Sequence, residues 1–281
     1  MSHIVVVGSI NLDIVGTVSR LPEVGETVTD ANIKRFPGGK GANQALAVRR
    51  LGADVTLLGC VGADSNADEA LILLRDAGVN LENLLKISSI PTGVALIIVD
   101  NNGDNQIVVG PGANGHLTPE KINLPESDAI ICQLEIPIET VSQVSRDYNG
   151  FLCINLAPSR EICRETLSRA DLLVVNETES QWYGEKLSIC KGFVATTYGA
   201  DGASLKKNGI EIARCRPPKV NSIDTTGAGD TFTAALTVAL VDGQSARDAL
   251  VFACKAGAIA TTKLGAQPSI PMRKEIEELV I

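Results

Sequence analysis

The feature that most constrains the fold is the repeated alternation of short, uniformly apolar runs with longer amphipathic segments. An apolar run without polar alternation is typical of a strand buried on both faces, as in a parallel sheet between helices. Six such runs predict core strands: Ile4–Gly8, Val55–Gly59, Ala129–Gln133, Phe151–Asn155, Leu172–Asn176 and Gly192–Thr197. Intervening segments predict helices over Gly41–Leu51, Asn66–Asp76, Ile138–Arg146, Ala228–Val241, Ala246–Thr262 and Arg273–Val280. The sequence therefore predicts an α/β fold with a mostly parallel central sheet and helices on both faces.

Two stretches interrupt this alternation. Residues 11–36 mix polar and apolar residues with Pro and Gly, and residues 93–109 read as a hairpin whose turn is Asn101–Asp104. A small sheet cannot bury both of its faces alone, so we expect these segments to form a lid that covers another part of the molecule. No linker is long enough to separate two domains. We therefore expect a single domain over residues 1–281, with the lid inserted in the α/β core.

Composition excludes several classes of protein. The net charge of −8 argues against a nucleic-acid surface, because binding to the phosphate backbone requires a basic face. Nothing reaches the roughly 18 consecutive apolar residues of a membrane span, and the start lacks the features of a signal peptide. The seven cysteines are scattered and contain no C-x-x-C pair, which predicts neither a zinc site nor a disulfide framework. We expect a cytoplasmic protein without a nucleic-acid or membrane partner.

The segment with the strongest chemical signal is Ile223–Phe232, IDTTGAGDTF, which leads into a predicted helix. Glycine lets the backbone approach a ligand closely, and the first turn of a helix offers unpaired N–H groups to an anion. Asp230 then lies where a carboxylate is electrostatically unfavourable. A phosphoryl-transfer enzyme needs both parts, namely donors for the phosphate and a base for the attacking hydroxyl. The local pattern fits equally well a helix start that Asp230 caps.

Two further segments offer polar groups at predicted strand or helix ends. Pro37–Ala45, PGGKGANQA, opens a helix with a glycine-rich turn followed by an Asn-Gln pair. Ser9–Asp13, SINLD, follows the first strand, and its Asn11 and Asp13 lie on the same side of an extended segment. Ligands of doubly wound sheets bind at the carboxyl ends of the strands, and polyols are recognised by such donors and acceptors. Each segment alone is also compatible with an ordinary turn or helix start.

Together these segments resemble the ribokinase-like (PfkB) carbohydrate kinases, and within that family the ribokinases. The resemblance spans nearly the whole chain. Its motifs are GSINLDIV at Gly8–Val15, PGGKGANQA at Pro37–Ala45, TGVALIIVD at Thr92–Asp100, PGAN at Pro111–Asn114, LEIP at Leu134–Pro137, NETE at Asn176–Glu179, DTTGAGDTF at Asp224–Phe232 and GAQPSIP at Gly265–Pro271. It implies a three-layer sandwich with a small β-sheet lid, and ATP-dependent phosphorylation of a small sugar at a primary hydroxyl, with D-ribose as the first candidate.

The resemblance also implies roles for individual residues. Asp230 would be the catalytic base, and Gly227, Ala228 and Gly229 would form the anion hole. The sugar would contact Asn11, Asp13, Gly39, Lys40, Asn43, Ala95, Glu135 and Asp230. ATP and its Mg²⁺ would be held by Asn176, Glu179, Thr197, Gly199, Gly202, Gly227, Gly229 and Cys254. A monovalent cation, K⁺, would bind the loop pair that contains Asp224, Thr226, Ala260, Lys263, Gly265 and Ser269. A homodimer formed through the lid is implied as well.

The chain departs from the family pattern in places. Asp201 replaces a basic residue in the nucleotide loop Thr196–Gly202, and the segment between Glu179 and Phe193 is shortened. The alternatives are another PfkB-type kinase, acting on fructose, a sugar acid, a sugar phosphate or a nucleoside, and a catalytically silent sugar- or nucleotide-binding protein. A nucleotide-dependent oxidoreductase is excluded, because no G-x-G-x-x-G follows the first strand.

Overall fold

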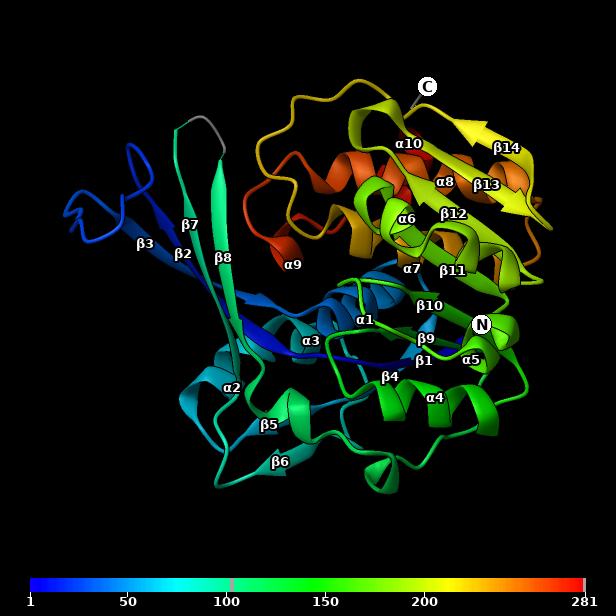
Figure 1. Ribbon diagram of the computed structural model, residues 1–281, viewed down its shortest axis with the longest axis horizontal. Coiled ribbons are helices and arrows are strands. Elements are labelled where there is room, and N and C mark those ends of the chain that lie inside the picture. Colours follow the sequence, from blue (N-terminus) through cyan, green and yellow to red (C-terminus); the bar gives the residue numbers. More distant parts are fainter. Residues whose placement is uncertain (102–103, 280–281) are drawn as a thin grey trace.

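The computed structural model describes residues 1–101 and 104–279. In this part of the chain the largest sheet has eight strands, which cross the body of the molecule in Figure 1. They are β1 (His3–Val7), β4 (Asp54–Leu58), β9 (Ala129–Gln133), β10 (Phe151–Asn155), β11 (Leu172–Asn176), β12 (Phe193–Thr197), β13 (Ala203–Lys207) and β14 (Ile210–Cys215). The order across the sheet is β14-β13-β12-β11-β10-β9-β1-β4, with β13 and β14 antiparallel to their neighbours and the other pairs parallel. The predicted mostly parallel sheet is confirmed, and the antiparallel edge was not predicted.

Helices cover both faces of the large sheet. Along β1, Ile4 and Val6 belong to one hydrophobic cluster while Val5 and Val7 belong to another, as the two-residue period of a strand requires. The first cluster includes α1 (Lys40–Arg50), α2 (Ser65–Ala70), α3 (Ile72–Asp76), α7 (Ala228–Val241), α8 (Ala246–Ala260) and α10 (Arg273–Glu278). The second includes α4 (Ile138–Asp147), α5 (Arg164–Arg169) and α6 (Glu177–Tyr183). The predicted three-layer sandwich is therefore confirmed.

Two predicted helices differ in extent from those observed. A single helix was predicted over residues 66–76, which is wrong: α2 and α3 are separated at Leu71, whose φ of −97° and ψ of −5° depart from helical values. Helix α10 ends at Glu278, and the predicted end at Val280 lies outside the described residues. The remaining helix ends agree with the prediction to within about two residues, the usual uncertainty of such boundaries.

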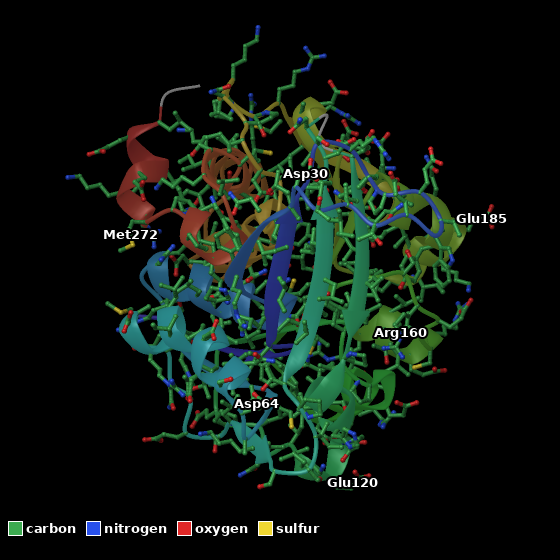
Figure 2. The ribbon with its side chains drawn as sticks, turned by 90° about the vertical axis from the view of Figure 1, so that its left-hand side faces the viewer. Asp30, Asp64, Glu120, Arg160, Glu185 and Met272 are labelled. Carbon is green, nitrogen blue, oxygen red and sulfur yellow. The ribbon has the colours of Figure 1, made fainter. Side chains whose placement is uncertain are left out.

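A second sheet, which we call the small sheet, stands apart from the large one (Figure 1). It consists of β3 (Asn32–Gly38), β2 (Asn11–Thr17), β7 (Gly93–Val99) and β8 (Asn105–Gly110), in that order. Figure 2 shows it nearly face-on. Strands β2 and β7 are parallel, and the other pairs are antiparallel. The segments predicted to form a lid thus supply these strands, although residues 102–103 of the predicted turn lie outside the described part. The short strands β5 (Cys60–Gly62) and β6 (Leu85–Ile87) pair separately.

The connections of the small sheet position the candidate site. Strand β2 follows β1 after a three-residue link at 8–10, and α1 begins two residues after the end of β3. The base of the small sheet therefore meets the carboxyl end of β1, where α1 also starts. Helix α1 packs against α7, so the amino-terminal turns of these two helices come together. Over residues 1–101 and 104–279, the longest helices are too short to cross a membrane.

Candidate active site

Asp230 lies in the first turn of α7 and is 5% exposed. The helix is capped by Gly227, whose φ of 78° is in the left-handed region and whose position provides no side-chain cap. The carboxylate of Asp230 instead accepts hydrogen bonds from two amides of α1: Asn43 Nδ2 (2.9 Å) and Gln44 Nε2 (3.0 Å). The alternative that Asp230 caps its own helix is therefore wrong. Its side chain joins α7 to α1 at the carboxyl edge of the sheet.

Charged side chains converge around Asp230. Burial raises the pKa of its carboxyl group, and the charge of Lys40 opposes that rise. Burial also raises the pKa of Asp13, to about 7, and repulsion from Glu135 and Asp230 adds to the effect. The pKa of Lys40 lies above its usual value because the charges of Asp230, Glu135 and Glu179 together outweigh its burial. The single ammonium group of Lys40 thus interacts with several carboxylates, so acidic side chains outnumber basic ones around Asp230.

The residues predicted to contact the sugar from the small sheet lie side by side. Asp13 in β2 is opposite Ala95 in β7, so both belong to the same level of the sheet. Asn11 is 3% exposed, and its Oδ1 accepts a hydrogen bond from Asn114 Nδ2 (2.7 Å). Asn114 also accepts from the backbone N–H of Ile10 (2.9 Å). These bonds turn the Asn11 amide in a defined direction, so Asn114 is a supporting residue that the site prediction did not include.

The start of α1, together with Glu135 after β9, supplies a second part of the predicted sugar site. Gly39 has a φ of 89°, and a Cβ there would lie 2.6 Å from the backbone nitrogen of Asn11, so only glycine fits. The next residue, Lys40, donates its backbone N–H to Glu135 Oε2 (3.2 Å), which also accepts a short bond from Ser9 Oγ. Glu135 follows β9, and Ser9 follows β1. The structure thus gathers the predicted sugar residues around the ends of two adjacent strands.

A pocket of about 570 Å³ borders the first turn of α7, and Ala228 and Gly229 form part of its wall. This volume is typical of a site for a small molecule. Of the residues predicted to bind the nucleotide, those that line the pocket are Thr197, Gly199, Gly202, Gly229 and Cys254. The wall also includes residues that were not predicted, among them the segment 217–220 and the α8 residues Gly257 and Ala258. Asp230 follows Gly229 of the pocket wall directly in the chain, so its carboxylate lies one residue beyond the lining of the pocket.

Asn176 and Glu179, also predicted for the nucleotide, lie outside the lining of this pocket. They form a capping box at the start of α6: Asn176 Oδ1 accepts from Glu179 N, and Glu179 Oε2 accepts from Asn176 N, both at 2.8 Å. This structural role was missed, although an Asn followed three residues later by Glu is a recognised sign of it. Only Oε2 takes part in the box, so Oε1 is available to a water or a cation.

The loop pair predicted to bind a monovalent cation is held together by Asp224. Its Oδ1 accepts from Thr226 N (2.9 Å) and Thr226 Oγ1 (2.6 Å), and its Oδ2 accepts from Gly265 N (2.8 Å). Ala260 ends α8, and Ser269 ends α9 (Ala266–Ser269) with its hydroxyl bonded to Ala266 O. Lys263, in contrast, is directed to a surface ion pair with Glu275 (3.7 Å). The carboxylate of Asp224 is thus occupied in joining the loops.

These arrangements limit the ways in which metal ions can be held. Across residues 1–101 and 104–279, no group of three or more His, Cys, Asp or Glu side chains is placed to hold a metal ion. Mg²⁺ in phosphate-binding sites keeps several waters and uses one or two carboxylates together with the substrate phosphates. Glu179 Oε1 fits that requirement. A monovalent cation in the loop pair would rely on backbone carbonyls, since the Asp224 carboxylate already has its partners.

Comparison with known proteins places this geometry in context. The sequence matches the pfkB family carbohydrate kinases over residues 1–273. A ribokinase of Bacillus subtilis is 37% identical over 294 residues, which cover 100% of both chains. The crystal structure of a Thermotoga maritima ribokinase has a TM-score of 0.90 at 35% identity and covers 99% of this chain and 98% of that one. An Arabidopsis thaliana ribokinase, solved with ribose and ATP, has a TM-score of 0.86 at 31% identity with coverage of 99% and 98%.

Proposed function

The chain belongs to the PfkB family of carbohydrate kinases, and from this premise we propose that it transfers the γ-phosphoryl group of ATP to the primary hydroxyl of D-ribose. The observation that carries the proposal is the placement of Asp230: a buried carboxylate in the first turn of α7, next to a pocket of about 570 Å³. The ribose and ATP bound to the Arabidopsis relative support this choice of substrates. The product would be ribose 5-phosphate.

In the proposed mechanism Asp230 accepts the proton of the attacking hydroxyl. The amides of Asn43 and Gln44 hold its carboxylate in place, and Lys40 offsets part of the local negative charge. The backbone N–H groups of Gly227–Gly229 face the charge that develops on the transferring phosphoryl group, as the start of a helix allows. Positioning and electrostatics supply most of the acceleration in phosphoryl transfer, and the base contributes a smaller part.

The sugar would lie between the small sheet and the start of α1. Asp13 would accept hydrogen bonds from its hydroxyls, and the amide of Asn11 would accept from them or donate to them. Glu135 and the backbone of Gly39–Lys40 would lie on one side of the sugar, and Ala95 on the other. A hydroxyl-rich ligand suits this set because amides and carboxylates together offer both donors and acceptors. The small sheet would act as the lid of the site. The cytoplasmic location expected from the sequence stays a prediction.

Mg²⁺ would be held by the phosphates of ATP and, through Glu179 Oε1, by the protein. When bound it would neutralise phosphate charge and polarise the transferring group. K⁺ would occupy the loop pair joined by Asp224, where it would order the turn that leads into Gly227–Gly229. The hydrogen bond from Gly265 N to Asp224 supports this coupling, because it ties the second loop to the one that precedes α7.

A homodimer through the small sheet is also proposed. Large apolar side chains are exposed on both faces of this sheet: Ile33, Leu96 and Val108 on one face, and Ile107 and Val109 on the face that also carries Asp13 and Ala95. Every residue of β8 is exposed, and an open strand edge with apolar residues favours pairing with another chain. Sedimentation velocity over a range of protein concentrations tests this point, and a monomer at all concentrations would refute the dimer.

The decisive experiment is a coupled ADP-release assay on the purified protein with a panel of acceptors: ribose, fructose, a deoxy-sugar acid, a sugar phosphate and a nucleoside. We expect the highest kcat/KM with ribose, and mass spectrometry should identify the 5-phosphate. A higher kcat/KM with another acceptor would reassign the substrate. ADP release that no acceptor stimulates would refute the kinase assignment.

A further inference from the structure

A chain of buried amides connects Asp230 to the central sheet. Gln44 and Gln133 are 0% exposed, and Asn155 is 6% exposed. Gln44 Nε2 donates to Asp230 Oδ1 (3.0 Å) and to Asn155 Oδ1 (3.2 Å), while Gln44 Oε1 accepts from Gln133 Nε2 (2.6 Å). Gln133 ends β9 and Asn155 ends β10, so the chain runs from a helix to two adjacent parallel strands.

The partners of Gln44 determine which way its amide points. Asn155 donates its Nδ2 to the carbonyl of Val174 (3.2 Å), which leaves its Oδ1 as an acceptor facing Gln44. If the Gln44 amide were reversed, its oxygen would face two acceptor oxygens, those of Asp230 and Asn155. Gln44 can therefore present only N–H groups to Asp230. Such donors favour the ionised carboxylate over the protonated form.

Asn43, the other partner of Asp230, lacks this constraint. It donates to Asp230 Oδ2 (2.9 Å), but its Oδ1 is buried without a hydrogen-bond partner. Its amide can reverse without losing a second bond, which suits a residue that also faces the proposed sugar. The two neighbours in sequence thus differ: Gln44 is anchored on the sheet side, and Asn43 is open on the sugar side.

The direction of the Gln44 amide matters because several charged groups around Asp230 oppose the ionised form of its carboxylate. Lys40 at the start of α1 favours the ionised carboxylate, whereas Glu135 after β9, Asp13 in β2 and Glu179 in α6 oppose it. Burial opposes it as well. A general base must remain ionised near the working pH. The hydrogen bonds from Asn43 and Gln44 both lower the pKa of Asp230, and only that of Gln44 has a fixed direction.

We propose that Gln44 is a positioning residue for the reaction: oriented by Asn155, with Gln133 as a further hydrogen-bond partner, it holds Asp230 ionised and aimed at the acceptor hydroxyl. This inference rests on the proposed kinase function and adds a role to a residue that does not itself touch the reacting atoms. Gly8 in the link after β1 supports it. A Cβ at Gly8 would overlap the Gln133 amide. The absence of a side chain at Gly8 therefore leaves room for Gln133 beside Gln44.

The test compares Gln44→Met, Gln44→Glu and Gln133→Met with the parent enzyme. A Gln143→Met variant, in which a glutamine of the distant helix α4 loses its bond to Asp147, serves as the matched control. For each we would measure kcat against pH at saturating sugar and ATP, KM for the sugar, and Tm. For Gln44→Met we expect kcat at neutral pH to fall roughly 10- to 100-fold, the usual effect of misplacing a reacting group. The sugar KM should change much less than kcat.

The pH profile separates positioning from packing. Losing a hydrogen bond to a charged group is comparable in free energy to one pKa unit, so the acid limb should move up by about one pH unit in Gln44→Met. Gln44→Glu has the shape of the parent side chain but presents acceptors to Asp230, so its limb should move further. Gln133→Met should move it in the same direction by less. The control should leave the profile unchanged.

An acid limb that stays in place in Gln44→Met, or a Glu variant closer to the parent than the Met variant, would overturn the proposal. If Gln44→Met does not fold, Gln44→Glu decides: an acid limb that stays in place in that variant would overturn the proposal. These outcomes differ from a failure of the kinase assignment, in which the parent enzyme itself would release no ADP in response to a sugar.

Discussion

Replacing Asp230 by Asn tests the catalytic assignment with little disturbance of the fold. In the structure Asp230 accepts from Asn43 Nδ2 and Gln44 Nε2. An Asn in its place would keep its Oδ1 toward Gln44, whose amide cannot reverse, and would turn its Nδ2 toward Asn43. The Asn43 amide can reverse without breaking another hydrogen bond, because its Oδ1 has no partner to lose. Both hydrogen bonds are thereby retained.

The stability of this variant should be equal to or higher than that of the parent. Burial raises the pKa of Asp230, so the ionised group opposes folding at any pH above that raised pKa. A neutral amide removes this opposition. The catalytic cost is much larger, because a general base typically contributes about 10²- to 10⁴-fold. This corresponds to a barrier higher by roughly 2.7 to 5.4 kcal/mol.

The assay is ADP release at saturating ribose and ATP, accompanied by thermal unfolding and by a measurement of ribose binding. We expect kcat to fall at least a hundredfold, with the Tm unchanged or raised and the ribose affinity within a few-fold of the parent. A kcat within tenfold of the parent in a folded variant would refute the role of Asp230 as base. A large fall in Tm would show that the hydrogen-bond exchange with Asn43 does not occur.

Further predictions concern the sugar site, the helix cap and the cation loops. Because the pKa of Asp13 is raised to about 7, kcat/KM for ribose should fall as the pH drops through 7, and Asp13→Asn should abolish that inflection while weakening binding; a pH-independent kcat/KM in the parent would contradict this. Removing the α6 cap by Asn176→Ala should lower the free energy of unfolding by about 1 kcal/mol, measured by urea denaturation, and no change would argue against the capping box. Gly265→Ala forces a side chain into a φ of 80° and places its Cβ 2.6 Å from the Phe36 ring, so it should cost roughly 1–3 kcal/mol of stability; an unchanged Tm would show that the loop relaxes freely. Replacing Na⁺ by K⁺ in the buffer should raise kcat, and indifference to the exchange would count against a cation in the loop pair.

Much of the architecture follows from local sequence patterns. Uniformly apolar runs identify strands buried on both faces, which is why β9, β10 and β11 have the predicted bounds. Helix α7 also has its predicted bounds, because the turn at Gly227 is followed directly by a long apolar segment. Strands β13 and β14, at one end of the sheet, were both missed. The edge strand β14 is largely exposed, and its mixed composition resembles that of a loop.

The residues of the candidate site likewise include some that sequence motifs identify and others that they do not. The motifs at residues 37–45 and 223–232 identified Asp230, Lys40 and Asn43 as candidates, since glycine turns at helix starts are legible in sequence. The Asn176–Glu179 capping box was legible too, but it was interpreted only as a nucleotide element. In contrast, nothing local in ICQLE distinguishes Gln133, and nothing in INLAP distinguishes Asn155, from any other residue at a strand end.

What the sequence alone determined is therefore the layered fold and most of its core strands, while its assignment of Asp230 as the catalytic carboxylate stays a prediction. What only the tertiary structure decided is the direction of the Asp230 carboxylate and the side chains that donate to it. Gln44 lies in a helix, whereas its partners lie at the ends of two strands. Gln133 is 89 residues and Asn155 is 111 residues from Gln44 along the chain. Hydrogen-bond direction depends on the simultaneous positions of all partners, so it exists only once the helix has packed on the sheet.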